Sequence, residues 1–113
     1  MRRIFITAGL AGALVSLPAG ARADDAQVQR GVAVYAAQKC SLCHAIAGVG
    51  KTHALDGVGA KLSAGDIHQW LVDPKAAALK AKSIAKPAMR DYSKLPPADI
   101  DALVAYMKSL TTK

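Results

Sequence analysis

Aromatic side chains are scarce in this chain of 113 residues, where Phe, Tyr and Trp together account for only 4%. Aromatic residues bury the largest areas per side chain, so a small domain with few of them has little to fill its core. The numerous alanines add little volume. Small domains commonly compensate for a thin core with a metal or a bound cofactor. The composition therefore indicates one small domain whose core is completed by something besides its own side chains.

The amino terminus lacks an apolar run long enough to span a membrane. The run Ile4–Leu17 counts 14 residues, whereas a spanning helix needs about 20. Arg2 and Arg3 precede this run, and Pro18 and the small-residue triplet at 21–23 follow it. A charged, then apolar, then small-residue order is typical of a secretory signal peptide.

We therefore expect residues 1–23 to be a cleaved signal peptide and residues 24–113 to be the mature, periplasmic domain. Cleavage removes three arginines and no acid, so the net charge falls from +7 to +4. No stable membrane insertion is expected after cleavage; an uncleaved anchor is the alternative. Nucleic acid is not an expected partner, because export would separate the chain from it and no basic helix or stacking platform accompanies the positive charge.

No strand pattern is visible, and the apolar spacing predicts helices over about 26–39, from Ser63 to before Pro74, over 75–82, and after Pro97. Ser63 followed by Asp66 resembles a capping box. Asp73 can cap the next helix, with Pro74 at its first position. The glycine-rich residues 45–62 and residues 83–95 read as loops. The expected fold class is all-α.

Cysteine is also scarce: the chain has only two, and they lie in the sequence Cys40-Ser41-Leu42-Cys43-His44. The pattern C-x-x-C-H is that of covalent haem attachment, in which two thiols bond to the porphyrin and the next imidazole binds the iron. A thioredoxin-like site would need a strand-and-helix context that is missing here. A zinc site would need both cysteines and two of His44, His53 and His68.

With this motif, the chain resembles a class I c-type cytochrome, the small monohaem bacterial kind, over essentially the whole mature domain. The resemblance includes Gly31 and Tyr35 in the first helix, the segment 55–59, the Trp70 helix followed by Asp73-Pro74, and the last helix with Leu103-Val104-Ala105-Tyr106. It implies a small cytochrome c fold, in which the first and last helices pack crosswise and shorter helices and loops surround one haem. Gly31 would then lie opposite Tyr106.

The resemblance also implies one covalent haem c, bound through Cys40 and Cys43, with His44 and Met89 as axial ligands of the iron. Met89 lies in a loop similar to the methionine loop of the family, although Arg90 stands where the family commonly has proline. His53, His68 and Met107 are the other possible ligands. Met107 falls on the apolar stripe of the last helix, where a core methionine is expected.

A ligating histidine needs an acceptor for its second ring nitrogen. For His44 we expect a backbone carbonyl between Gly48 and Leu55. His53 stands where the family often has a proline whose carbonyl does this, or it is a solvated loop residue. Trp70 is expected either to donate its indole N–H to a haem propionate, as in some relatives, or to be ordinary core.

The sequence thus predicts a periplasmic one-electron carrier rather than an enzyme. An alternative is a haem c relay subunit of a periplasmic dehydrogenase complex, and a haem enzyme or gas sensor would need an open sixth position. Redox proteins with an acidic docking surface are the expected partners, unless the basic residues around the methionine loop are merely solvated. Those residues are Lys75, Lys80, Lys82, Lys86, Arg90 and Lys94.

Overall fold

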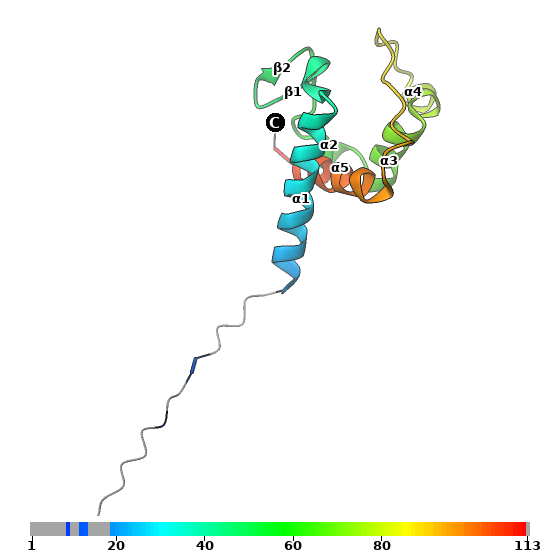
Figure 1. The fold of residues 1–113 in the computed structure, drawn as a ribbon. Coiled ribbons are helices and arrows are strands. Elements are labelled where there is room, and N and C mark those ends of the chain that lie inside the picture. Colours follow the sequence, from blue (N-terminus) through cyan, green and yellow to red (C-terminus); the bar gives the residue numbers. More distant parts are fainter. Residues whose placement is uncertain (1–8, 10–11, 14–18, 113) are drawn as a thin grey trace, which may run out of the picture.

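The computed structural model describes residue 9, residues 12–13 and residues 19–112 of the chain. The apolar run of the predicted signal peptide therefore lies largely outside the described residues. The described part is mostly helical, as the sequence predicts (Figure 1). Its α-helices are α1 (Ala19–Ala37), α2 (Val58–Lys61), α3 (Ala64–Val72), α4 (Pro74–Ala81) and α5 (Pro97–Ser109), and a 3-10 helix, η1, spans Cys40–Leu42.

The starts of α3 and α4 follow the predicted capping pattern. The Ser63 hydroxyl accepts a hydrogen bond from the Asp66 N–H at 3.1 Å, and the Asp73 carboxylate accepts one from the Ala76 N–H at 3.2 Å. Each cap satisfies one amide that the first helical turn leaves without a partner. The first helix differs from prediction, because it starts at Ala19 rather than near residue 26. The predicted cleavage point after Ala23 thus falls inside α1.

The expectation that the chain has no strands is wrong. Strands β1 (His44–Ile46), β2 (Val49–Gly50) and β3 (His53–Ala54) form a small sheet in the order β2-β1-β3. Strands β1 and β2 are antiparallel, with Ile46 opposite Val49, and the two residues between them have positive φ angles of 51° and 81°. This is the backbone twist of a tight hairpin. Strands of two or three residues are too short to show alternation in a sequence.

The first and last helices cross, as the resemblance implies, with α5 lying across the middle of α1 at a steep angle (Figure 1). Gly31 makes the crossing possible: a Cβ added there would overlap the Ala102 carbonyl oxygen and lie 2.6 Å from the Tyr106 Cβ. Beside it, the rings of Tyr35 and Tyr106 meet edge to face, with centroids 5.7 Å apart. The expected placement of Gly31 opposite Tyr106 is confirmed.

The core is small and lies where α1, α3 and α5 meet. Met107 is 7% exposed and belongs to the buried core, as its place on the apolar stripe predicts. The central cluster consists of Val34, Leu71, Ile100 and Leu103. No helix among the described residues is long and apolar enough to cross a membrane.

Helix α2 is fastened to the carboxyl-terminal end of α5 through Gly59. The Gly59 N–H donates to the Leu110 carbonyl at 2.8 Å, and the Lys108 ammonium donates to the Gly59 carbonyl at 2.7 Å and the Leu62 carbonyl at 3.1 Å. A side chain at Gly59 would collide with the Lys108 backbone. The segment after the sheet is therefore anchored to the last helix.

Candidate functional site

The two cysteines follow the end of α1 directly. Lys39 adopts the left-handed conformation, with φ of 55°, and its N–H donates to the Ala36 carbonyl at 3.1 Å. Such a residue ends a helix and turns the chain. The chain then forms η1, in which the Cys43 N–H donates to the Cys40 carbonyl at 3.1 Å. Both thiols are free, with Cys40 half-buried and Cys43 exposed.

Burial raises the pKa of the Cys40 thiol, and the nearby Arg90 guanidinium partly opposes this by favouring the thiolate. At neutral pH the net effect keeps Cys40 as a thiol. Because Cys40 and Cys43 are three residues apart and both unbonded, the two sulfurs can react with two neighbouring groups of one ligand.

His44 is held in one orientation by the backbone of β3. Its Nδ1 donates a hydrogen bond to the His53 carbonyl at 3.0 Å, and the His53 N–H donates to the Cys43 carbonyl at 3.1 Å. A carbonyl can only accept, so the proton is on Nδ1 and the lone pair is on Nε2. The expectation of a carbonyl acceptor between Gly48 and Leu55 is confirmed, and the acceptor belongs to His53.

Burial lowers the pKa of the half-buried His44 imidazole, and the neighbouring His53 ring lowers it further, while the hydrogen bond to the His53 carbonyl acts the other way. The lowered pKa keeps His44 neutral at pH 7, which is the form that binds a metal. The His53 side chain is exposed, so this residue contributes through its main chain.

The turn that brings β3 back to His44 depends on Gly50 and Asp56. Gly50 has a φ of 122°, and a side chain there would collide with the His44 carbonyl. The Asp56 carboxylate accepts a hydrogen bond from the Ala47 N–H at 2.8 Å, which fixes the hairpin turn between β1 and β2. The role of Asp56 was not predicted; its position beside Gly57 in a glycine-rich loop is the only sequence signal that could have indicated it.

Met89 lies in the segment between α4 and α5 and is half-buried against the central core cluster. This segment is fastened to α3 by the Tyr92 N–H, which donates to the Leu71 carbonyl at 2.8 Å. In Figure 1 the segment, yellow to orange, rises with α3 and α4 on one side of α5, whereas β1, which begins with His44, stands on the other side. His44 and Met89 thus belong to two separate parts of the fold.

The described residues contain no group of three or more His, Cys, Asp or Glu side chains that could hold a metal ion. The zinc alternative required four such ligands from the cysteines and histidines. The His44 and His53 rings have their centroids 6.1 Å apart, and His68 lies exposed on α3. The geometry therefore gives the zinc site no support.

A cytochrome c family model matches residues 28–111, which is most of the chain and includes the C-x-x-C-H segment. The chain belongs to the cytochrome c family. Comparisons with curated proteins and with solved structures gave no significant match. Membership implies a covalently attached haem c and supports haem-based electron transfer rather than enzymatic catalysis. The mostly helical architecture with crossed terminal helices agrees with the small cytochrome c fold.

The residues present fit a haem c. Two free thiols lie three residues apart, and the imidazole that follows has Nδ1 bound and Nε2 available. Among the described side chains of the domain, only that of the small Ala102 is less than 2% exposed. The core therefore keeps surface that a bound cofactor would cover. A buried polar atom without a partner points the same way: the Tyr35 hydroxyl, close to Cys40, has no hydrogen-bond partner among the described residues.

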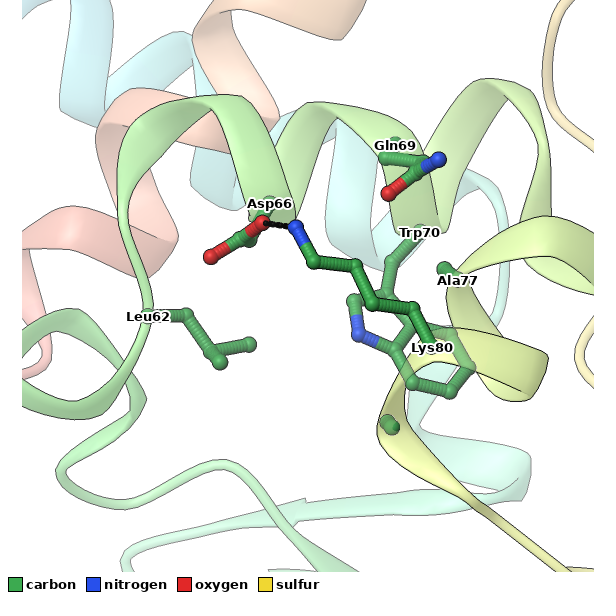
Figure 2. Close-up of a pocket in the computed structure, with 7 residues that line it drawn as sticks. Leu62, Asp66, Gln69, Trp70, Ala77 and Lys80 are labelled. Atoms are coloured by element: carbon green, nitrogen blue, oxygen red, sulfur yellow. Dashed lines mark hydrogen bonds and ion pairs between the residues drawn. The ribbon is translucent and has the colours of Figure 1, made fainter.

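Trp70 lines an open pocket of about 130 Å³ between α3 and α4 rather than the central core (Figure 2). Lys80 lines the same pocket, and its ammonium group donates to the Asp66 carboxylate at 2.8 Å (Figure 2). This hydrogen bond, with hydrogen bonds to the Asp66 carboxylate from the side chain and the backbone of Ser63, holds the pKa of Asp66 below its usual value. The alternative of ordinary core packing is not favoured for Trp70; its role toward a propionate stays a prediction.

Tyr35→Phe is expected to leave the free energy of unfolding unchanged or to raise it by up to about 1 kcal/mol, because the hydroxyl is buried and has no partner in the part of the chain that the structure describes. Burial, and then the neighbouring Cys40, raises the pKa of Tyr35 from 10.0 to about 12. The folded protein therefore keeps a proton that the unfolded chain loses. This difference in the pKa of Tyr35 contributes to the free energy of unfolding. The contribution is fully present below pH 10 and falls as the pH rises toward 12.

Urea unfolding of the wild type and of Tyr35→Phe at pH 8 and at pH 11 measures this effect. The wild type is expected to lose more stability than the variant over that interval. Tyr92→Phe is the matched control, because the Tyr35 hydroxyl, and not that of Tyr92, is buried without a partner among the described residues. An equal loss in wild type and Tyr35→Phe would show that the Tyr35 hydroxyl ionises normally.

Proposed function

We propose that the chain is an exported, periplasmic one-electron carrier. Cys40 and Cys43 would hold haem c by thioether bonds, and His44 and Met89 would be the axial ligands of its iron. When bound, the haem supplies a ferric/ferrous couple that accepts and returns a single electron. The observation that carries the proposal is the hydrogen bond from His44 Nδ1 to the His53 carbonyl in a chain of the cytochrome c family.

Each proposed site residue has a distinct task. The thioether bonds of the two cysteines would hold the porphyrin covalently. The haem then cannot dissociate, so the carrier can meet its partners without losing its cofactor. The His53 carbonyl fixes the orientation of His44 and increases its basicity as a ligand. Met89 would close the sixth position with a thioether, which favours the ferrous state and raises the reduction potential. With both positions filled, little has to rearrange during transfer.

Exposed basic residues support docking to an acidic redox partner. All six basic residues between 75 and 94 are exposed, and they surround the segment that carries Met89. A surface of one charge sign increases the rate at which oppositely charged partners meet, most strongly at low ionic strength. Lys80 is engaged with Asp66 and Arg90 with the Gln38 carbonyl, so we propose the remaining four as the partner-facing charges. They are Lys75, Lys82, Lys86 and Lys94.

A relay subunit of a periplasmic dehydrogenase complex is the second candidate, and exposed apolar side chains favour it. Leu79 is 75% exposed and Ile84 is 91% exposed, and both lie within the basic segment. Permanent interfaces are richer in apolar area than transient ones. Stable co-purification with a larger enzyme would support the subunit, whereas a monomeric protein that exchanges electrons with several acidic partners would support the free carrier.

Met89→Leu tests the ligation that this proposal requires. The substitution keeps the size of the side chain but removes the sulfur, so the absorption band of ferric iron bound to methionine is expected to disappear and the ferrous protein to bind carbon monoxide rapidly. Met107→Leu is the matched control: Met107 is core, a similar-volume swap there costs less than about 1.5 kcal/mol, and the spectrum is expected to stay that of the wild type.

Two outcomes would contradict the proposal. One is rapid carbon monoxide binding by the ferrous wild type, which would mean that the sixth position is open. The other is an unchanged spectrum in Met89→Leu together with a changed one in Met107→Leu, which would mean that Met107, and not Met89, is the ligand.

A further inference from the structure

Arg90, the residue next to Met89, reaches across to the end of the first helix. Its guanidinium Nη2 donates to the Gln38 carbonyl at 3.4 Å, and its central carbon lies 5.7 Å from the centre of the Tyr92 ring. The guanidinium is therefore placed between the segment that carries Met89 and the turn that leads into Cys40. Both contacts are typical of arginine, which combines several N–H donors with a flat cationic face.

The Gln38 carbonyl is a favourable acceptor for a cation. It follows the last residue of α1, where the carbonyls of the final turn have no partner within the helix and the helix dipole is negative. Gln38 also lies two residues before Cys40. A contact at this point joins the Met89 segment to the part of the chain that holds the predicted attachment cysteines.

The rest of the segment between α4 and α5 is loosely held. All residues from 81 to 88 are exposed. The Lys82 and Ser83 N–H groups still donate to carbonyls of α4, but beyond them the Ala85 N–H reaches only the nearby Ser83 hydroxyl, at 3.4 Å. The next main-chain anchor to another element is the Tyr92 N–H on the Leu71 carbonyl, three residues after Met89. Segments with few buried contacts open locally at low cost, so a contact beside Met89 has a large influence on where its side chain lies.

We propose that Arg90 is a positioning residue for Met89, and that its contacts with the Gln38 carbonyl and the Tyr92 ring keep the thioether at the sixth position. The inference rests on the proposed function, because it requires Met89 to be a ligand. Arg90 restrains the segment by its contacts with the Gln38 carbonyl and the Tyr92 ring. Removing the guanidinium increases the fraction of molecules in which Met89 has left the iron, without unfolding the domain.

Imidazole titration of the ferric haem protein measures that fraction. Imidazole binds only when the sixth position is free, so its apparent affinity is proportional to the population of the open form. Arg90→Ala is expected to bind imidazole about fivefold more tightly than the wild type, the change that a typical net hydrogen bond produces. Its urea midpoint of global unfolding, followed by Trp70 fluorescence, is expected to stay close to that of the wild type.

Lys94→Ala is the matched control, since it removes one positive charge from the same exposed segment without touching the Gln38 carbonyl. It is expected to bind imidazole as the wild type does. Equal imidazole affinity in Arg90→Ala and wild type would overturn the inference, and so would an equal increase in Lys94→Ala. A wild type that lacks the methionine band and binds imidazole as tightly as Met89→Leu would instead refute the proposed ligation itself.

Discussion

Replacing Gly31 with alanine is expected to lower the free energy of unfolding by about 3 kcal/mol, although alanine is the better helix former by about 1 kcal/mol. The added methyl group would overlap the Ala102 carbonyl oxygen and lie 2.6 Å from the Tyr106 Cβ. Both obstacles belong to the backbone of α5 or to the first atom of a side chain. Neither can rotate away, so the two helices must separate.

Gly65→Ala is the matched control, because a Cβ on Gly65 in α3 would meet nothing closer than the Ser63 hydroxyl at 3.9 Å. That substitution is expected to leave the stability unchanged or to raise it by up to about 1 kcal/mol. Urea unfolding followed by helical circular dichroism measures both variants. If Gly31→Ala were as stable as Gly65→Ala, the close crossing of α1 and α5 would be wrong.

Replacing both Cys40 and Cys43 with serine is expected to abolish covalent haem attachment completely. The chain has no other cysteine, so no thioether can form. Haem that remains bound to the protein after denaturation, detected on a denaturing gel, measures the effect. Each single variant is expected to retain one bond at reduced yield. The double variant should also be less stable than the haem-loaded wild type, because its small core lacks the macrocycle.

His53→Ala is the control for that experiment. His53 lies in the same loop, but it contributes a main-chain carbonyl to His44, which alanine also supplies. Covalent attachment is therefore expected to persist in His53→Ala. Haem retained after denaturation in the double cysteine variant would contradict the assignment of C-x-x-C-H. Loss of haem in His53→Ala would mean that the side chain of His53, not its carbonyl, acts in the site.

The helices could be predicted from the sequence because their signals are local. Ser63 and Asp73 cap the helices that they were expected to cap, and Met107 is buried as its position on the apolar stripe predicts. The placement of Gly31 opposite Tyr106 was expected from the resemblance to the family, and the close approach of Gly31 to Ala102 and Tyr106 confirms it. The beginning of α1 was placed too late, because alanine-rich sequence gives little indication of where a helix starts.

The parts that could not be predicted depend on main-chain groups and on contacts between distant residues. Strands β1, β2 and β3 are only two or three residues long, so the sequence shows no alternation of apolar and polar residues there. The hydrogen-bond acceptor for His44 belongs to residue 53 because the register of β1 with β3 places His44 opposite His53. The sequence does not indicate this register. The contact of Arg90 with the Gln38 carbonyl spans 52 positions, and neither residue indicates the other in the sequence.

A spectroelectrochemical titration of the protein, matured in a periplasm that attaches haem, tests the central claim most directly. The account predicts a single reversible one-electron wave with a slope of about 59 mV per tenfold change in the ratio of oxidised to reduced protein. It also predicts that Met89→Leu shifts the midpoint to lower potential, whereas Met107→Leu leaves it in place. A chain that carries no covalent haem, or a haem whose potential is the same in wild type and Met89→Leu, would contradict it.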